Sequence, residues 1–380
     1  MIQKTNSPSL RVRLLLFNVL IIFFLINEII FAGDDPEKKI QSWSVNLSLG
    51  SYYDSNILKY SEKYLTRFLN GQDEGRFHID SYDDFIFKYS ASLIYSNRMF
   101  GNLLTIFGAG FDSDAYTVNS VKSWFTYDFF WRQYVSTSLS FLISYSHIPE
   151  YYVRHFRDED LVDSLGFTPE TFQPYEFTKD DFSFWVQNIF SWKTTRARLY
   201  FSYMRYFLNS SYSEYDSKDF LFGFRVFQRL TEDLDLNFGY LYGTSDATGF
   251  DEPGETKEIS DDSDASNYEH TYTAGLGLRL PRIFSLSNEI TLDAQYQRAI
   301  FTTNDNPISD PLHSGRYDNH YRVFINYNLD VLSNLFLTVF YNWMGREAST
   351  YSDVNKQYVS NEKDYTQYRV GIRLNYLIKF

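Results

Sequence analysis

The chain has 380 residues, a formal net charge of −13, no cysteine, and an aromatic content of 20% beside 22% charged residues. This composition excludes intrinsic disorder, which needs few aromatic residues and much charge. The absence of cysteine excludes disulfide scaffolds, zinc–thiolate sites and thiol nucleophiles. The acidic balance argues against nucleic acid as a partner, because phosphate binding requires a positive surface.

The N-terminal segment, residues 1–32, is predicted to be a secretory signal peptide. Basic residues precede an apolar run over residues 14–31, which ends before Ala32 and two aspartates. An uncleaved anchor helix is the alternative interpretation. Either one sends residues 33–380 out of the cytoplasm, and this remainder contains no linker, so we expect a single domain there.

From residue 41 onward, apolar and polar residues alternate. In residues 85–95, for example, six apolar side chains share one face, while Ser90 and Ser92 lie on the other. A period of two indicates strands with one apolar and one polar face. The pattern predicts fourteen strands, at residues 41–53, 82–97, 101–112, 120–131, 134–147, 181–192, 195–208, 218–230, 234–245, 268–280, 287–302, 317–329, 334–346 and 365–380.

The connections between these strands alternate between short and long. The longest are residues 54–81 and 148–180. An even number of strands, with short links at one end and long links at the other, predicts an all-β, antiparallel up-and-down transmembrane barrel. A secreted soluble β-sandwich or solenoid is the alternative. The second face of a sandwich would be charged, whereas here it is rich in Ser, Thr, Asn, Gly and Tyr.

The last predicted strand ends on an aromatic residue at the final position of the chain. Leu374, Tyr376 and Phe380 share its apolar face. This arrangement resembles the C-terminal signal of Gram-negative outer-membrane β-barrel proteins. The resemblance implies recognition by the barrel assembly machinery and a location in the cell outer membrane, surrounded by lipid.

A second, shorter resemblance lies near the start of the predicted barrel. The segment 50–58, GSYYDSNIL, looks like the opening of barrels associated with tetratricopeptide proteins, such as surface lipoprotein assembly modifiers. It covers under a dozen residues and the chain has no helical repeat domain, so no activity is transferred from it.

Placing the apolar row outside assigns the other row to the lumen. Arginines in a water-filled lumen would favour anionic solutes. The alternative is that lumenal carboxylates pair with the arginines and close the barrel. The predicted lumen and constriction residues are Arg132, Arg196, Arg198, Arg225, Arg229, Arg279, Arg322, Arg369, Arg373, Asp128, Asp235 and Asp293.

Three other features have residue types that could carry chemistry or close the barrel. In the 54–81 connection, Ile57, Tyr60 and Tyr64 have helical spacing, but an irregular loop is the leading expectation. The acidic stretch 245–269 lacks the glycine and distal glutamate of a calcium loop, so a solvated loop without metal is predicted. His147 lies at a strand end, counted as opposite Asn119, with no serine beside it on its row.

The sequence therefore predicts an outer-membrane channel or facilitated uptake pore for small polar or anionic solutes, with no cofactor and no enzymatic activity. A non-conducting outer-membrane scaffold, or an export or assembly partner, is the alternative. A lipid or peptide hydrolase at the barrel rim is a minor alternative.

Overall fold

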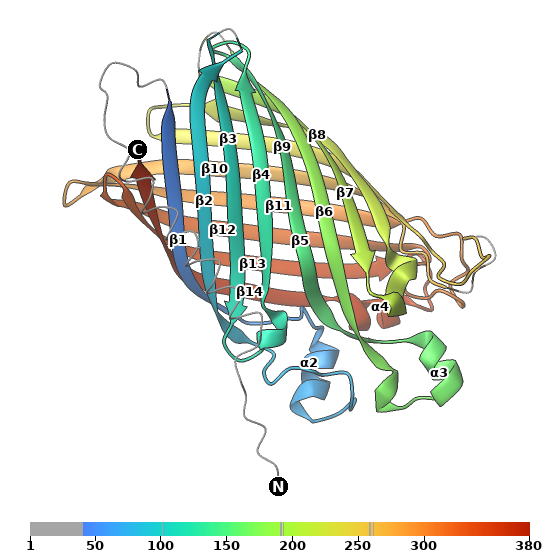
Figure 1. Ribbon diagram of the computed structural model, residues 1–380. Helices are drawn as coiled ribbons and strands as arrows, with labels where there is room; N and C mark the ends of the chain where they lie inside the picture. Colours follow the sequence, from blue (N-terminus) through green and yellow to red (C-terminus); the bar gives the residue numbers. More distant parts are fainter. Residues whose placement is uncertain (1–40, 101, 191, 193, 258–259, 261) are drawn as a thin grey trace.

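The computed structural model describes residues 41–380, except residues 101, 191, 193, 258–259 and 261. The predicted signal peptide lies outside the described residues. The described chain forms a closed antiparallel barrel of fourteen strands, in which sequence neighbours pair and β1 closes onto β14 (Figure 1). The predicted fold class and strand number are confirmed.

Each of the fourteen predicted strands has its counterpart in the barrel. Their bounds follow in chain order. The strands are β1 (Ser42–Asp54), β2 (Asp84–Met99), β3 (Leu103–Tyr116), β4 (Trp124–Tyr134), β5 (Leu139–Arg157), β6 (Phe172–Ile189), β7 (Thr195–Leu208), β8 (Ser217–Arg229), β9 (Leu234–Ala247), β10 (Asn267–Ile283), β11 (Leu286–Phe301), β12 (Arg316–Leu332), β13 (Leu335–Thr350) and β14 (Tyr365–Lys379).

The prediction of a long loop at 148–180 is wrong. Strands β5 and β6 stay paired as far as Arg157 and Phe172, which leaves only 158–171 as the connection. The register shifts twice on the way, between Ile148 and Tyr151 and again after Tyr152. Bulges of this kind move side chains to the other face, so the period of two that marked the strands is lost there.

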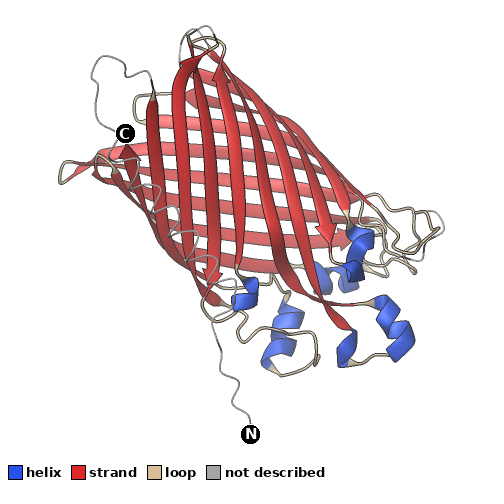
Figure 2. Ribbon diagram, in the orientation of Figure 1, coloured by secondary structure: helices blue, strands red, loops and turns tan. Residues whose placement is uncertain are grey.

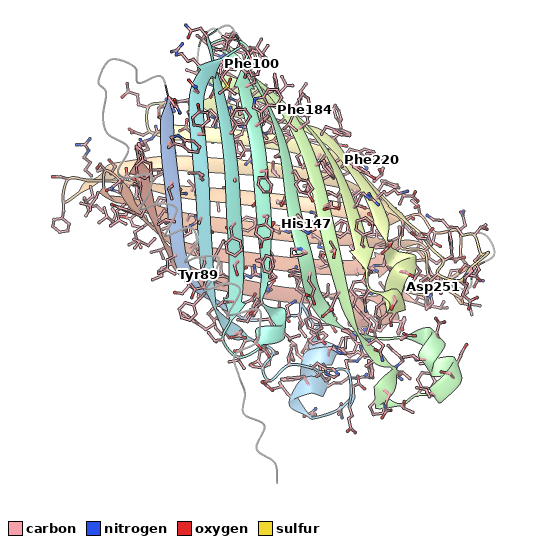
Figure 3. All side chains as sticks on the ribbon, in the orientation of Figure 1. Tyr89, Phe100, His147, Phe184, Phe220 and Asp251 are labelled. Atoms are coloured by element: carbon pink, nitrogen blue, oxygen red, sulfur yellow. The ribbon has the colours of Figure 1, made fainter. Side chains whose placement is uncertain are left out.

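The apolar row faces outward, as predicted. Leu199, Phe222 and Ile372 are 55%, 61% and 52% exposed, although each lies in the middle of a strand. Phe184 and Phe220 stand on the same outer wall (Figure 3). A contiguous apolar band of this kind suits lipid rather than water as its surroundings.

The two ends of the barrel differ. Tight turns join the strands at one end, the short-turn end, whereas the helices and long connections gather at the other, the long-loop end (Figure 2). Among the described residues, no helix is long and apolar enough to cross a membrane. The α-helices are α2 (Glu62–Leu69), α3 (Glu159–Leu165) and α4 (Lys356–Lys363).

Helix α2 corrects the expectation of an irregular loop between the first two strands. Its N-cap is Ser61, Glu62 occupies the first turn and Arg67 the last, so both end charges suit the helix dipole. The helical spacing of apolar residues in this segment was therefore the better guide.

Candidate functional site

The connection between β1 and β2 covers the barrel mouth at the long-loop end. We call residues 55–83, which include α2, the mouth plug. Ile57, Leu58 and Tyr60 of the plug are at most 4% exposed. They pack in one apolar cluster with inner-wall residues that include Tyr52 and Tyr116. The plug is therefore part of the folded core.

The plug is anchored where it leaves β1. Asp54 is fully buried, and it accepts hydrogen bonds from Gln367 Nε2 at 2.7 and 2.8 Å and from Arg369 Nε at 2.8 Å. Asn56 Nδ2 donates to the carbonyls of Tyr60 (2.8 Å) and Thr366 (3.1 Å). The aspartate and asparagine of the GSYYDSNIL segment thus fasten the plug to β14.

The β5–β6 hairpin leans over the same mouth and meets the plug. Gly75 of the plug has a φ of +89°, and a Cβ there would collide with the backbone of Pro169. Arg76 of the plug lies 4.7 Å from the ring of Phe172 at the start of β6. Only glycine allows so close an approach at a positive φ. Figure 1 shows the two strands reaching beyond the others toward α3.

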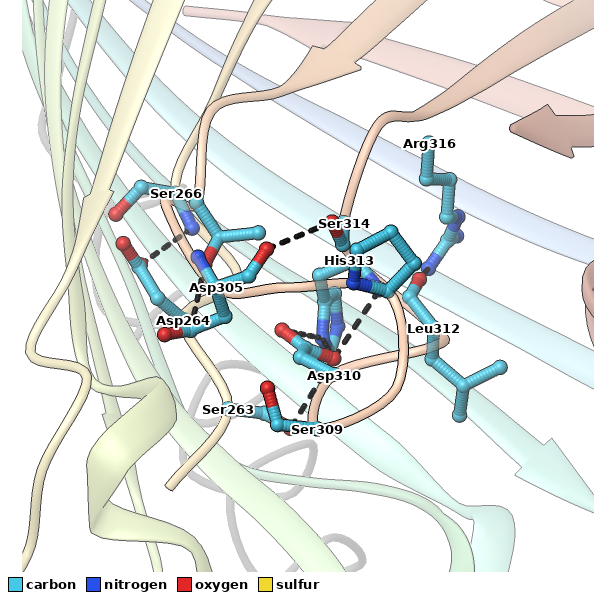
Figure 4. A network of polar contacts seen from close by, with 12 residues as sticks. Ser263, Asp264, Ser266, Asp305, Ser309, Asp310, Leu312, His313, Ser314 and Arg316 are labelled. Atoms are coloured by element: carbon cyan, nitrogen blue, oxygen red, sulfur yellow. Dashed lines mark hydrogen bonds and ion pairs between the residues drawn. The ribbon is translucent and has the colours of Figure 1, made fainter. Parts of the chain in front are cut away.

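The remaining long connections are tied to one another by polar contacts. Asp310 accepts a hydrogen bond from Ser263 at 3.4 Å, and this contact joins the β9–β10 and β11–β12 connections (Figure 4). Within the β11–β12 connection, Asp310 is paired with His313 Nδ1 at 2.9 Å. Burial lowers the pKa of His313. Tyr212 donates to the Phe156 carbonyl at 2.7 Å and so fixes the β7–β8 connection to β5. These contacts tie the long connections to one another and to the barrel wall.

The acidic stretch 245–269 includes the β9–β10 connection. Its Lys257 pairs with Asp246 at 2.7 Å and with Asp264 at 3.7 Å. Within the described part of the chain, no three side chains of the metal-ligating types come together. Lys257 thus holds two of the acidic side chains of the stretch.

At the short-turn end, four of the nine predicted lumenal arginines converge on two aromatic rings of the inner wall. The Trp185 ring lies 5.0 Å from the Arg132 guanidinium and 4.3 Å from that of Arg198. The second ring, Phe227, lies 4.1 Å from Arg196 and 5.2 Å from Arg225. We call these six residues, Arg132, Trp185, Arg196, Arg198, Arg225 and Phe227, the arginine–aromatic stack.

Arg198 is the central cation of the stack. Its Nη2 and Nη1 donate to Gln187 Oε1 at 2.7 Å and to Tyr200 Oη at 2.8 Å. These partners are neutral, so the charge of Arg198 is held in place without being cancelled. Arg225, in contrast, has Asp293 at 3.4 Å.

The other candidate residues have varied surroundings. Asp235 binds both Arg229 (3.1 Å) and Arg279 (2.9 Å) at the rim of the short-turn end. Asp293, Arg369 and Arg373 line a lumenal cavity of about 350 Å³. Asp128 of β4 faces Ser146 of β5, and Arg322 of β12 faces Gln295 of β11.

The two interpretations of the lumen therefore each describe part of it. Carboxylates pair with some arginines, as in a closed lumen, while others rest on rings or amides. Within the described residues, the predicted arginines with an ion pair are Arg225, Arg229, Arg279 and Arg369, and those without one are Arg132, Arg196, Arg198, Arg322 and Arg373.

His147 does not lie opposite Asn119. The register pairs it with Tyr127 on one side and Asp180 on the other, because the turn between β4 and β5 falls at 135–138 rather than 132–133. Its Nδ1 is 2.9 Å from Asp180 Oδ1, which also accepts from Tyr145 at 2.7 Å. Figure 3 places His147 on the outer wall. The contacts are those of a polar group at the edge of an apolar band.

The stack itself was missed from the sequence. Each of its arginines was assigned to the lumen, but their gathering around Trp185 and Phe227 depends on the register between β4 and β8. One signal in the sequence could have indicated it: an arginine and an aromatic residue that both face the lumen on adjacent strands. Such cross-strand pairs lie about 5 Å apart.

Of the comparisons with known proteins, the one with solved structures found matches. No family profile matches the chain, and no curated protein matches it in sequence. Its shape is similar to solved structures of the outer membrane channel DcaP of Acinetobacter baumannii (11% identity, 90% of this chain and 99% of that one, TM-score 0.44), an anion-selective porin from Comamonas acidovorans (8%, 89% and 99%, 0.41) and OprD from Pseudomonas aeruginosa (10%, 92% and 97%, 0.38).

Proposed function

We propose that the chain is an outer-membrane channel for small polar solutes, with a preference for anions in its lumen and a mouth restricted by the plug. The observation that carries the proposal is the arginine–aromatic stack. Its guanidinium groups project from the inner wall of a closed barrel, and most of them have no carboxylate partner. Fixed charge in a narrow passage sets which ions enter it.

The outer wall supports the location. Its apolar band is interrupted by few polar side chains, and burial of that band in a bilayer would remove the exposed rings from water. Fractionation of cells that express the full chain should recover the barrel with the outer membrane. Recovery as a soluble periplasmic protein would refute this location.

Planar-bilayer recording tests the conduction. The purified barrel with plug residues 62–80 replaced by a short Gly-Ser linker should give conductance steps and a reversal potential of the sign expected for anions. Arg198→Gln should reduce this selectivity more than Arg229→Gln, because Arg229 already pairs with Asp235. Equal effects of the two variants, or cation selectivity, would contradict a role for the stack.

A non-conducting scaffold remains the second candidate, and the covered mouth is the observation that favours it. The plug, the β5–β6 hairpin and the tied loops together bring a large folded surface to the long-loop end. A barrel that gives no steps even after the plug is shortened would fit the scaffold and not the channel.

A further inference from the structure

Four cationic side chains lie close together at the long-loop end, each from a different element. Lys59 belongs to the plug, Arg154 to β5, Arg346 to β13 and Lys363 to the last turn of α4. We call these four residues the basic ring. More than 300 residues of sequence separate Lys59 from Lys363, so only the closure of the barrel and the folding of its loops bring them together.

Two aromatic rings and two backbone carbonyls connect the four cations. The Phe156 ring lies 5.3 Å from the Arg154 guanidinium and 5.8 Å from the Lys363 ammonium. The Tyr365 ring lies 5.1 Å from Arg346 and 6.0 Å from Lys59. Arg154 Nη2 also donates to the Lys59 carbonyl at 3.3 Å, and Arg346 Nε donates to the Lys363 carbonyl. The contacts run in a closed circuit.

The basic ring has little counter-charge, and that only at Arg346. Within the described part of the chain, no carboxylate lies within 4 Å of the charged groups of Lys59, Arg154 or Lys363. Asp318 is 3.9 Å from Arg346, but Arg316 binds the same carboxylate more closely. Arg154 is only 9% exposed, and its Nε has no hydrogen-bond partner. A buried, unpaired donor of this kind is costly unless something binds to it.

The two lysines of the basic ring have lowered pKa values. Burial, and then the positive charges of Arg369, Arg322 and Arg346, lower the pKa of Lys59 to about 8. Burial also lowers the pKa of Lys363. Both shifts have the sign that an uncompensated group of cations produces.

We propose that the basic ring binds a compact anion with at least two negative charges, of the carboxylate or phosphate type. A singly charged anion would leave most of the ring uncompensated, whereas a polyvalent one can engage ammonium and guanidinium groups from opposite sides. The inference rests on the proposed channel function, because it names the class of solute that would occupy the mouth.

Titration calorimetry on the purified full chain in detergent, at pH 7 and low salt, tests this inference. Citrate and pyrophosphate are the two probes, one for each anion type, and acetate is the monovalent control. We expect saturable binding of one citrate or one pyrophosphate per chain. The affinity for acetate should be lower by at least about tenfold. Binding that is equal for acetate and for both polyvalent anions would overturn the proposal.

Variants locate the site. Lys59→Gln and Lys363→Gln should each lower the affinity for the polyvalent anion by at least about tenfold. Lys356→Gln is the matched control, since Lys356 begins the same helix but is exposed and paired with Asp353 at 2.6 Å. Lys59→Gln should also raise the thermal unfolding midpoint of the anion-free protein, because it removes repulsion. Unchanged anion affinity in a folded Lys59→Gln protein would refute the site.

The two proposals can fail separately. A barrel that conducts but does not bind citrate or pyrophosphate would refute the basic ring as a site and leave the channel intact. A barrel that binds one of these anions through Lys59 and Lys363 but never conducts would support the site and refute the channel.

Discussion

Two adjacent residues of β12 offer a direct test of which face meets lipid. Ile325 is 41% exposed on the outer wall, whereas Asn326 lines the lumenal cavity. Both lie near the middle of the strand, so an arginine at Ile325 would enter the apolar band near its midplane. Arginine at such a position costs about 2–4 kcal/mol of folding free energy.

The cost of Asn326→Arg should be smaller and of another origin. Asn326 Nδ2 donates to Thr291 Oγ1 at 3.0 Å, and the loss of one such hydrogen bond costs about 1 kcal/mol. A lumenal arginine avoids lipid and joins other polar groups there. Ile325→Arg should therefore be the more destabilising substitution by about 1–3 kcal/mol.

The measurement is equilibrium unfolding in urea of the barrel refolded into phospholipid vesicles, followed by tryptophan fluorescence. Both variants and the parent protein are compared under reversible conditions, so that differences in unfolding free energy have meaning. If Asn326→Arg proves as costly as Ile325→Arg, or costlier, the assignment of the apolar band to lipid is wrong.

Three further outcomes follow from particular contacts. Deletion of Phe380 should lower the yield of folded barrel in cells, because its backbone N–H donates to the Trp43 carbonyl where β14 meets β1; a normal yield would show that it is dispensable. Burial, with Asp262, Asp251 and Asp160 nearby, raises the pKa of Glu214 to about 8, so the folded state holds this proton more tightly than the unfolded chain. Stability of the loops against proteolysis should then fall as pH rises from about 4.5 to 8, and Glu214→Gln, but not the exposed Glu232→Gln, should flatten that decline. Glu362 accepts from both Lys63 and Tyr64 of the plug, so Glu362→Ala should increase the frequency of channel opening, and identical recordings would argue against the plug as the restriction.

The strands could be predicted because each has two distinct surroundings. A side chain that faces lipid must be apolar and one that faces the lumen need not be. Apolar and polar residues therefore alternate along each strand of the sequence. The prediction failed at 148–180, where Pro149 and two bulges shift the faces within a strand that continues to pair. A local sequence pattern cannot reveal a strand of this kind, because pairing with the neighbouring strand keeps it extended although its own alternation is lost.

The mouth could not be predicted in the same way. The helical spacing of Tyr60 and Tyr64 indicated α2, but nothing in it indicated that the helix would reach Glu362 of α4. The basic ring depends on four elements that meet only in three dimensions. Arg154 lies in the predicted 148–180 loop, but its position relative to Lys363 is set by how the β5–β6 hairpin bends over the barrel.

The same device recurs at both ends of the lumen. In the arginine–aromatic stack and in the basic ring, several cations rest on aromatic faces: Trp185 and Phe227 at one end, Phe156 and Tyr365 at the other. A carboxylate would position an arginine equally well but would cancel its charge. An aromatic face holds the cation through its quadrupole and leaves the charge free to act on a passing ion.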